Sequence, residues 1–173
     1  MKIEYPVKDK TISQHFGRDV VGDPIYGGFY KQFNNKHCGV DFPVNVGTPV
    51  YASFSGKIVR VEDHRGMGLV VGVQYKNILA LYAHLSSVKV KVGQFVNTGE
   101  EIALSGQTGS ACPTPHLHFE LRDISKNSLK DMVFNPPFGK EVKQLQENFN
   151  PHSPIYIIRK FLQKILSKIT KFD

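Results

Sequence analysis

Residues 69–85 read LVVGVQYKNILALYAHL, two apolar runs that decide the class of fold. Val, Ile, Leu and Tyr fill both runs, and such residues favour the pleated, half-buried surface of a β-sheet. Similar runs recur along the chain with glycines between them, so we expect strands within 48–54, 57–62, 69–75, 78–85, 101–106 and 116–122. Short strands at this spacing predict an all-β protein, a small antiparallel β-sandwich or barrel-like sheet.

Residues 141–173 differ in kind from the rest of the chain. Apolar side chains recur there at helical spacing, with basic side chains between them: Ile158, Phe161, Leu162, Ile165, Leu166, Ile169 and Phe172 against Arg159, Lys160, Lys164, Lys168 and Lys171. Ser153 suits a helix N-cap and Pro154 the first helical position. We therefore expect a folded domain over 1–140, followed by a linker and a basic amphipathic C-terminal helix. This helix can pack on the sheet domain or dock on a membrane surface or partner, and both interpretations are open.

Composition and charge limit the classes of function. The 173 residues suffice for one well-packed domain, and the net charge of +7 is spread thinly apart from the tail. Because no basic stripe is interleaved with aromatics, nucleic acid is not expected as a partner. A mildly basic surface suits an anionic polymer such as a bacterial cell wall. No apolar run approaches the ~20 residues of a membrane span, and the first residues, MKIEYPVKDK, do not resemble a secretory signal peptide.

The first candidate metal-binding segment places His37 four residues before Asp41, in a run rich in glycine and proline that excludes a helix. On a flat strand, residues four apart are separated by ~13 Å, too far to share one ion through bonds of ~2 Å. Both can bind one ion only if the chain bends between them, and Gly39 can supply the bend. A surface histidine beside a turn aspartate is the alternative.

The second candidate segment is TPHLHFE, residues 114–120. His116 and His118 lie on one face of the predicted strand, with ~6–7 Å between their backbones, which suits two groups converging on one site. An earlier run ends near His84, and alternation with Tyr82 and Ala80 predicts that His84 faces the same surface.

A histidine, an aspartate and a further histidine supply three nitrogen and oxygen ligands. Three protein ligands plus a water are typical of a catalytic zinc, whereas a structural zinc normally has four protein ligands. The remaining histidines, His15, His64 and His152, fit surface or loop positions. Residues 16–36 fit a long ordered loop, and such loops often carry function.

Several stretches together resemble the LytM/lysostaphin-type zinc endopeptidases of bacterial cell walls. They are the His-x-x-x-Asp spacing, GTPVYASFSGKIV, YAHLSSVKVKVGQFVNTGEEIALSGQTG and PHLHFEL. The likeness covers about residues 12–137. It implies the duplicated hybrid motif, a small antiparallel β-fold, with a Zn²⁺ cofactor and hydrolysis of amide bonds in the peptide part of peptidoglycan. It also implies a location in the cell envelope or outside the cell.

Carried over by position, the resemblance makes His37, Asp41 and His118 the zinc ligands. It makes His84 and His116 the catalytic histidines, without dividing the roles between them. These roles are chemically consistent, because zinc lowers the pKa of its water toward ~7 and polarises a carbonyl. Two uncoordinated imidazoles can take up a proton and stabilise an oxyanion.

The loop TGSACPTPHLHFE departs from the Ser/Thr/Gly stretch usual in that family. It contains Cys112, and Cys38 adjoins a ligand position. A Cys38–Cys112 disulfide, two buried free thiols and a thiol beside the metal are all open. Tyr26 and Tyr30, in the loop before His37, can supply a phenol to the transition state.

Two other classes of function compete with the enzyme. A catalytically inactive relative that binds cell wall or activates a hydrolase typically lacks some ligands, yet here all five positions are filled. A sugar-phosphotransfer carrier of related fold needs paired histidines but no metal, and Asp41 argues against it.

Overall fold

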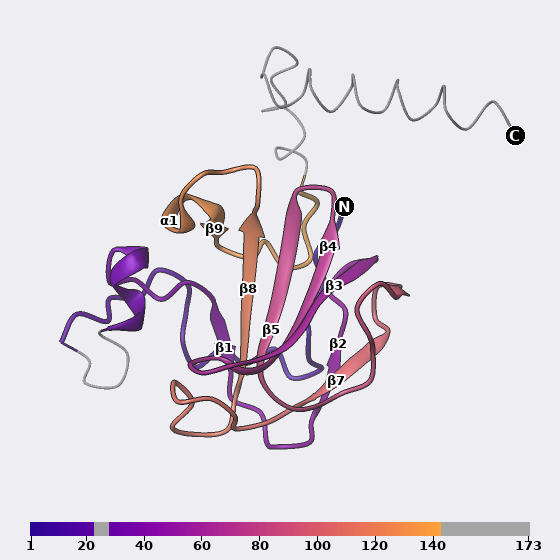
Figure 1. Ribbon diagram of the computed structural model, residues 1–173, viewed down its shortest axis with the longest axis horizontal. Coiled ribbons are helices and arrows are strands. Elements are labelled where there is room, and N and C mark those ends of the chain that lie inside the picture. The colour runs from indigo at the N-terminus through magenta and orange to yellow at the C-terminus, as the bar shows by residue number, and fades with distance from the viewer. Residues whose placement is uncertain (23–27, 143–173) are drawn as a thin grey trace, which may run out of the picture. The chain divides into compact units, whose positions relative to one another are not determined.

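The computed structural model describes residues 1–22 and 28–142, which form one antiparallel sheet with short helical turns beside it (Figure 1). The expected all-β antiparallel class is confirmed. In chain order the elements are η1 (Phe29–Phe33), β1 (Val40–Phe42), β2 (Pro49–Tyr51), β3 (Gly56–His64), β4 (Gly68–Tyr75), β5 (Ile78–Val88), β6 (Phe95–Val96), β7 (Glu101–Ser105), β8 (Leu117–Asp123), α1 (Leu129–Met132) and β9 (Val133–Phe134).

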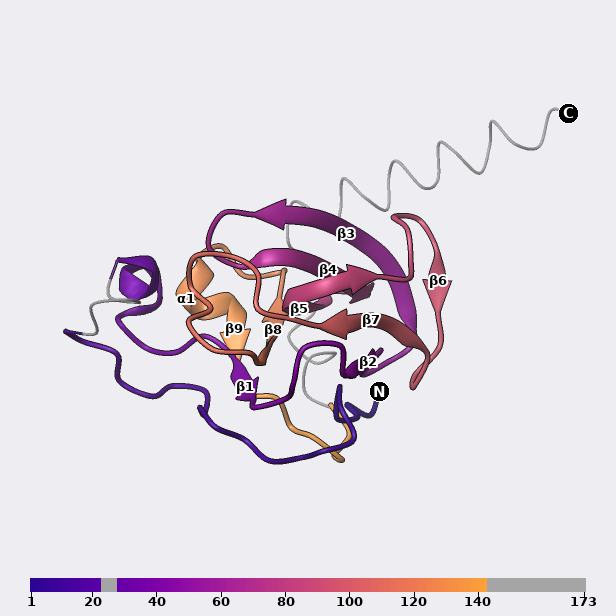
Figure 2. The ribbon, with the colours of Figure 1, turned by 90° about the horizontal axis from the view of Figure 1, so that it is seen from below.

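Strand β5 is the centre of the sheet. The neighbouring strands run in the order β1-β8-β5-β4-β3-β6, with β7 also paired to β5, β2 paired to β7, and β9 paired to β8. Figure 2 shows the curvature of the sheet from β3 round to β7 and β2. β5 has strand partners along both edges, and every residue from Ile78 to Leu85 is buried.

The two faces of β5 bury different kinds of side chain. Tyr82 is opposite Phe119 of β8, and their rings pack with centroids 5.2 Å apart. Ala83 is opposite His118, so it shares the other face with the histidine. That second face carries an apolar cluster as well, made of Met67, Val70, Leu79, Leu81 and Ala83. The candidate site is therefore built on the face turned away from the Tyr82–Phe119 pair.

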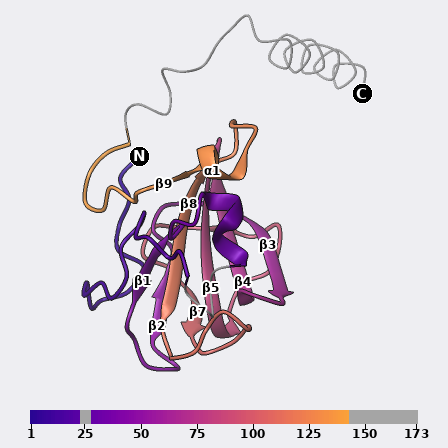
Figure 3. The same cartoon turned by 90° about the vertical axis from the view of Figure 1, so that its left-hand side faces the viewer.

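The shortest elements were not predicted from the sequence. Strands β1, β6 and β9 have only two or three residues each, too few to produce an alternating pattern. The loop 16–36 contains η1, which packs with Val20, Cys38 and Val133 in a small apolar cluster. Figure 3 shows the side of the molecule that carries η1, and α1 contacts η1.

The predicted tail helix lies outside the described residues, which end at Val142. Among the residues that are described, no helix is long and apolar enough to cross a membrane.

A close approach between β1 and β8 depends on Gly39. A Cβ atom at this position would lie 2.5 Å from the Phe119 carbonyl oxygen and 2.8 Å from Cε1 of His118. We expect Gly39→Ala to lower the free energy of unfolding by about 1–3 kcal/mol, because the two strands must separate to admit the methyl group.

Urea denaturation would measure this loss. The control is Gly28→Ala, where a Cβ meets nothing within 4 Å and φ is an ordinary −76°. Equal stability of the two variants would contradict the role given to Gly39.

Candidate functional site

Pairing of β1 with β8 brings the three expected metal ligands together. Asp41 is directly opposite His118 in the antiparallel register, and His37 lies just before β1. His37 Nε2 is 3.3 Å from Asp41 Oδ1 and 3.2 Å from His118 Nδ1, while His118 Nδ1 is 2.7 Å from Asp41 Oδ1. All three side chains are buried. One atom from each is thus directed at a common point.

The chain bends between His37 and Asp41, as their spacing required. The bend lies at Gly39, as the sequence predicted, and the φ of Gly39 is outside the left-handed region. The missing side chain of Gly39 also leaves room for the imidazole of His118.

Hydrogen bonds fix which nitrogen of each imidazole faces this point. His37 Nδ1 donates to the His15 carbonyl oxygen at 3.1 Å, and His118 Nε2 donates to Glu120 Oε1 at 3.0 Å. In their neutral forms, His37 Nε2 and His118 Nδ1 then carry lone pairs. Both nitrogens face Oδ1 of Asp41.

Three buried electron-pair donors at such short range require positive charge between them. Burial opposes ionisation of Asp41, but the neighbouring imidazoles lower its pKa well below the usual range. Burial likewise opposes a charge on His118, yet Asp41 and its other polar partners raise its pKa well above the ordinary value. A divalent cation supplies this charge equally well, and these three residues form a set that can hold one.

The geometry fits zinc. Tetrahedral zinc with bonds of about 2.0–2.1 Å holds its nitrogen and oxygen ligands ~3.3 Å apart. Two of the three observed separations, 3.2 and 3.3 Å, match this value, and the third is shorter at 2.7 Å. Three protein ligands also leave a fourth position for water or substrate.

A β-bulge places His84 beside this cluster. Leu69 pairs with Leu85 and Val71 with Tyr82, so the single residue Val70 opposes both Ala83 and His84. His84 adopts φ 61°, a left-handed conformation that is unusual for a residue with a Cβ.

The bulge changes the face on which His84 lies. Regular alternation would place His84 on the face of Tyr82, which packs with Phe119 away from the site. The bulge instead turns His84 toward His116 and His118, with ring centroids 4.7 and 5.9 Å away. His84 therefore shares a face with His116 and His118 because of the bulge and not because of regular alternation.

His84 and His116 are held in matching orientations. Each donates from Nδ1 to a backbone carbonyl at 2.8 Å, His84 to Thr108 and His116 to Thr114. Their Nε2 atoms therefore carry the lone pairs, and Nε2 of His116 lies 3.9 Å from Asp41 Oδ2. Burial lowers the pKa of His116, and burial together with the neighbouring imidazoles lowers that of His84 to about 3. Both rings are neutral proton acceptors at neutral pH.

Thr108 connects His84 to the loop that precedes β8. Its hydroxyl donates to the Leu85 carbonyl oxygen at 2.8 Å and accepts from the Leu69 backbone N–H at 3.0 Å. These bonds tie the loop to both strands at the bulge. The loop therefore holds the Thr108 carbonyl oxygen in position to accept the hydrogen bond from His84 Nδ1.

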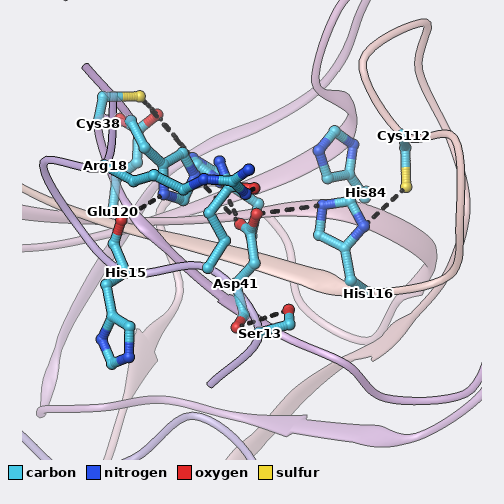
Figure 4. A network of polar contacts seen from close by, with 12 residues as sticks. Ser13, His15, Arg18, Cys38, Asp41, His84, Cys112, His116 and Glu120 are labelled. Carbon is cyan, nitrogen blue, oxygen red and sulfur yellow. Dashed lines mark hydrogen bonds and ion pairs between the residues drawn. The ribbon is translucent and has the colours of Figure 1, made fainter. Parts of the chain in front are cut away.

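The two cysteines are free and buried, so the disulfide considered above is absent. Cys38 Sγ donates to Glu120 Oε1 at 2.9 Å, behind His118. Cys112 Sγ donates to the Thr114 carbonyl oxygen at 3.2 Å and lies 3.4 Å from His116 Nδ1. Each thiol therefore stands behind a different histidine of the site, and Figure 4 shows Cys112 beside His116.

Glu120 and Arg122 complete the support of His118 and were not singled out from the sequence. Glu120 is fully buried, and its second oxygen accepts from Arg122 Nε at 2.7 Å. Burial alone would raise the pKa of Glu120, but His118 and Arg122 lower it to about 2. The sequence did offer a signal for Glu120, because it is an acidic residue two places after His118 on the same face of the strand, where it can hydrogen-bond to a ligand histidine.

The remaining candidates lie at the edge of the site. Tyr30 is buried, and its ring packs edge-on against His37 with centroids 5.7 Å apart. Its role as a phenol donor remains a prediction, and Tyr26 lies outside the described residues. His15 and His64 have exposed side chains, as expected for loop and surface residues.

Glu120 provides a test of the arrangement behind His118. Glu120→Gln keeps the size and an accepting oxygen but removes the charge that orients the ligand. We expect zinc affinity to fall about 10–100-fold, the usual effect of losing an outer-shell partner. Competition against a chelator measures this affinity.

The matched control is Glu62→Gln, the same change at an exposed position of β3. Zinc affinity that is unchanged in a folded Glu120→Gln variant would show that Glu120 does not position the ligand.

Comparison with known proteins agrees with this geometry. The profile described as Peptidase family M23 matches residues 35–132. Peptidoglycan DD-endopeptidase ShyA of Vibrio cholerae is 45% identical over 107 residues, which cover 61% of this chain and 24% of ShyA. Lysostaphin of Staphylococcus simulans is 45% identical over 121 residues, covering 66% of this chain and 24% of lysostaphin. The chain thus spans about a quarter of these curated relatives.

Solved structures share the fold. A zinc-containing peptidase from Vibrio cholerae superposes with a TM-score of 0.63 at 30% identity, covering 79% of this chain and 39% of that one. The catalytic domain of lysostaphin from Staphylococcus simulans gives a TM-score of 0.61 at 36% identity, covering 73% of this chain and 88% of the lysostaphin domain. The family profile spans more than half of the sequence and includes all five site positions. The chain belongs to peptidase family M23.

Proposed function

We propose that this chain is a zinc-dependent endopeptidase that hydrolyses peptide bonds in bacterial peptidoglycan. The observation that carries the proposal is the pair of neutral imidazoles beside a buried His-Asp-His set with zinc spacing. Peptidases of family M23 are zinc-dependent. The names of its relatives, a peptidoglycan DD-endopeptidase and lysostaphin, support the cell wall as substrate.

In this proposal His37 Nε2, Asp41 and His118 Nδ1 hold the zinc ion. When bound, zinc acidifies its water and polarises the scissile carbonyl. His15 and Glu120 keep both ligand imidazoles in the tautomer that presents a lone pair. The protein thus fixes the ligands before the ion arrives, which limits the ordering cost of binding.

The proton transfers belong to His84 and His116. His116 Nε2 faces Asp41, so it is placed to accept the proton of the attacking water. The imidazolium formed in this way can pass its proton to the leaving amine nitrogen. His84 lies against His116 and is the second uncoordinated imidazole of the proposed catalytic pair. Burial lowers the pKa of both imidazoles, so both rings are neutral at neutral pH and each keeps a free lone pair on Nε2.

We propose further that the catalytic domain is residues 1–140 and that residues 141–173 are a separate segment. Every proposed site residue precedes 119, and the contacts of the chain divide it into Met1–Val142 and Lys143–Asp173. Action on peptidoglycan would place the protein in the cell envelope or outside the cell. Contact of the tail with a membrane surface belongs to the same proposal.

Variants of the histidines separate ligands from catalytic groups. His118→Ala should lose zinc and activity together, because only two protein ligands remain. His116→Ala and His84→Ala should keep stoichiometric zinc and lose turnover by a factor of about 10² or more. Bound zinc and fragments released from several purified peptidoglycans, identified by mass spectrometry, are the two measurements.

His15→Ala is the matched control, since it removes an exposed imidazole but keeps the carbonyl that His37 uses. Equal zinc loss in His116→Ala and His118→Ala would make both residues ligands. A wild-type protein that binds walls and zinc without releasing fragments would be a binding module.

Removal of the tail tests the domain assignment. A chain ending at Val142 should stay folded, bind one zinc ion and hydrolyse soluble wall fragments at the full-length rate. Binding of the two chains to lipid vesicles with anionic headgroups tests the membrane contact. Loss of zinc from the folded, shortened chain would place the tail within the catalytic domain.

A further inference from the structure

A second group of ligand atoms lies beside the proposed zinc site. His84, Cys112 and His116 each place one ligand atom within 4.8 Å of the others, and all three side chains are buried. We propose that these residues form a second metal site for a soft divalent cation such as zinc, and that filling it stops catalysis. The inhibitory part of this proposal rests on the catalytic roles proposed above.

The separations suit a metal with one sulfur ligand. Tetrahedral zinc with a sulfur bond of about 2.3 Å and a nitrogen bond of about 2.0 Å holds the two ligand atoms ~3.5 Å apart. Cys112 Sγ is 3.4 Å from His116 Nδ1. Figure 4 shows the sulfur directed at this nitrogen, with the His84 ring beside both residues. The three groups need little movement to meet one ion.

Occupation of this site would change the proton on His116. In the metal-free arrangement His116 Nδ1 carries the proton and donates it to the Thr114 carbonyl, which leaves Nε2 free. A metal at Nδ1 requires the ring proton to move to Nε2, where it faces Asp41 Oδ2 at 3.9 Å. The Cys112 thiol loses its proton to solvent as the metal–sulfur bond forms. The imidazole then has no lone pair for the attacking water.

The donor set separates this site from the first. His37, Asp41 and His118 offer two nitrogens and an oxygen, whereas the second site offers two nitrogens and a thiolate. Thiolate ligands favour zinc and other soft ions over magnesium and calcium. Hard cations should therefore leave the enzyme active.

A third group of ligand atoms, Cys38, His118 and Glu120, is a weaker candidate. Arg122 already neutralises Glu120, with Nη2 at 2.5 Å from Oε2, and its charge repels a cation. Cys38 also lies farther from its histidine, with 3.9 Å between Sγ and His118 Nε2. This comparison makes Cys38 the natural control for Cys112.

Cobalt reports the sulfur ligand directly. The full chain is loaded with two equivalents of Co²⁺, and the near-ultraviolet charge-transfer band of a thiolate–cobalt bond is measured. We expect the band in the wild type and in Cys38→Ser, and its loss in Cys112→Ser and Cys112→Ala. Absence of the band from the wild type, or its loss from Cys38→Ser instead, would overturn the assignment.

Wall hydrolysis tests the consequence for catalysis. The enzyme with one equivalent of zinc should lose activity as zinc is added, whereas added magnesium should have no effect. Measured against its own rate with one equivalent of zinc, Cys112→Ser should need more than about tenfold higher zinc than the wild type for the same fractional inhibition, since even an outer-shell loss costs 10–100-fold in affinity. Inhibition of Cys112→Ser at the wild-type zinc concentration would refute the site.

The two proposals fail separately. If the singly loaded wild type releases no wall fragments, the proposed enzyme activity fails, while the cobalt band still decides whether the second site exists. Retained zinc in the first site shows that each cysteine variant is folded.

Discussion

Three buried electron-pair donors cannot face one another without a positive charge between them, and the site is built around this constraint. The antiparallel register of β1 and β8 places Asp41 opposite His118, and the tight approach at Gly39 brings the preceding histidine into the same cluster. Desolvation makes each lone pair costly to leave without a partner. Part of the free energy of binding a cation therefore comes from giving these buried lone pairs a partner. Because the pairing of β1 with β8 brings the donors together, metal binding is coupled to the pairing of these two strands.

His84, one of the two proposed catalytic imidazoles, depends on a different feature, the bulge in β5. A left-handed φ at His84 carries strain of roughly 1–3 kcal/mol for a non-glycine residue. Hydrogen bonds oppose that strain, because the His84 backbone N–H donates to the Met67 carbonyl and its ring donates to Thr108. The bulge converts a strand position that would enter the apolar core into one that faces His116 and His118. This is the use that bulges have near active sites, where they redirect a side chain without ending the strand.

Every histidine of the site has a polar partner on the side away from the metal. For three of them the partner is a backbone carbonyl, and for His118 it is Glu120, whose charge Arg122 balances. A carboxylate makes the ligand more basic than a carbonyl does, so His118 is the ligand whose electronic properties the protein controls most directly. The two thiols occupy this same outer layer, one behind a ligand and one behind a catalytic imidazole. Their different neighbours, an ion pair for Cys38 and neutral groups for Cys112, give them different capacities for a second cation.

The sequence alone predicted the class of fold, which the structure confirms, and it named the five residues proposed for the site. Long apolar runs such as 69–75 and 78–85 are periodic enough to predict strands, and the two histidines of TPHLHFE share a face in any regular strand. The tertiary structure decided two features that the periodicity of the sequence does not show, the strand β1 and the orientation of His84. Strand β1 is three residues long and exists because β8 pairs with it, and His84 reaches the site through an irregularity that simple alternation excludes. The position of Cys38 behind His118 was also decided there, because the two residues are far apart in the chain and come within 3.9 Å of each other only in the folded protein. The free state of both thiols is likewise a property of the tertiary structure.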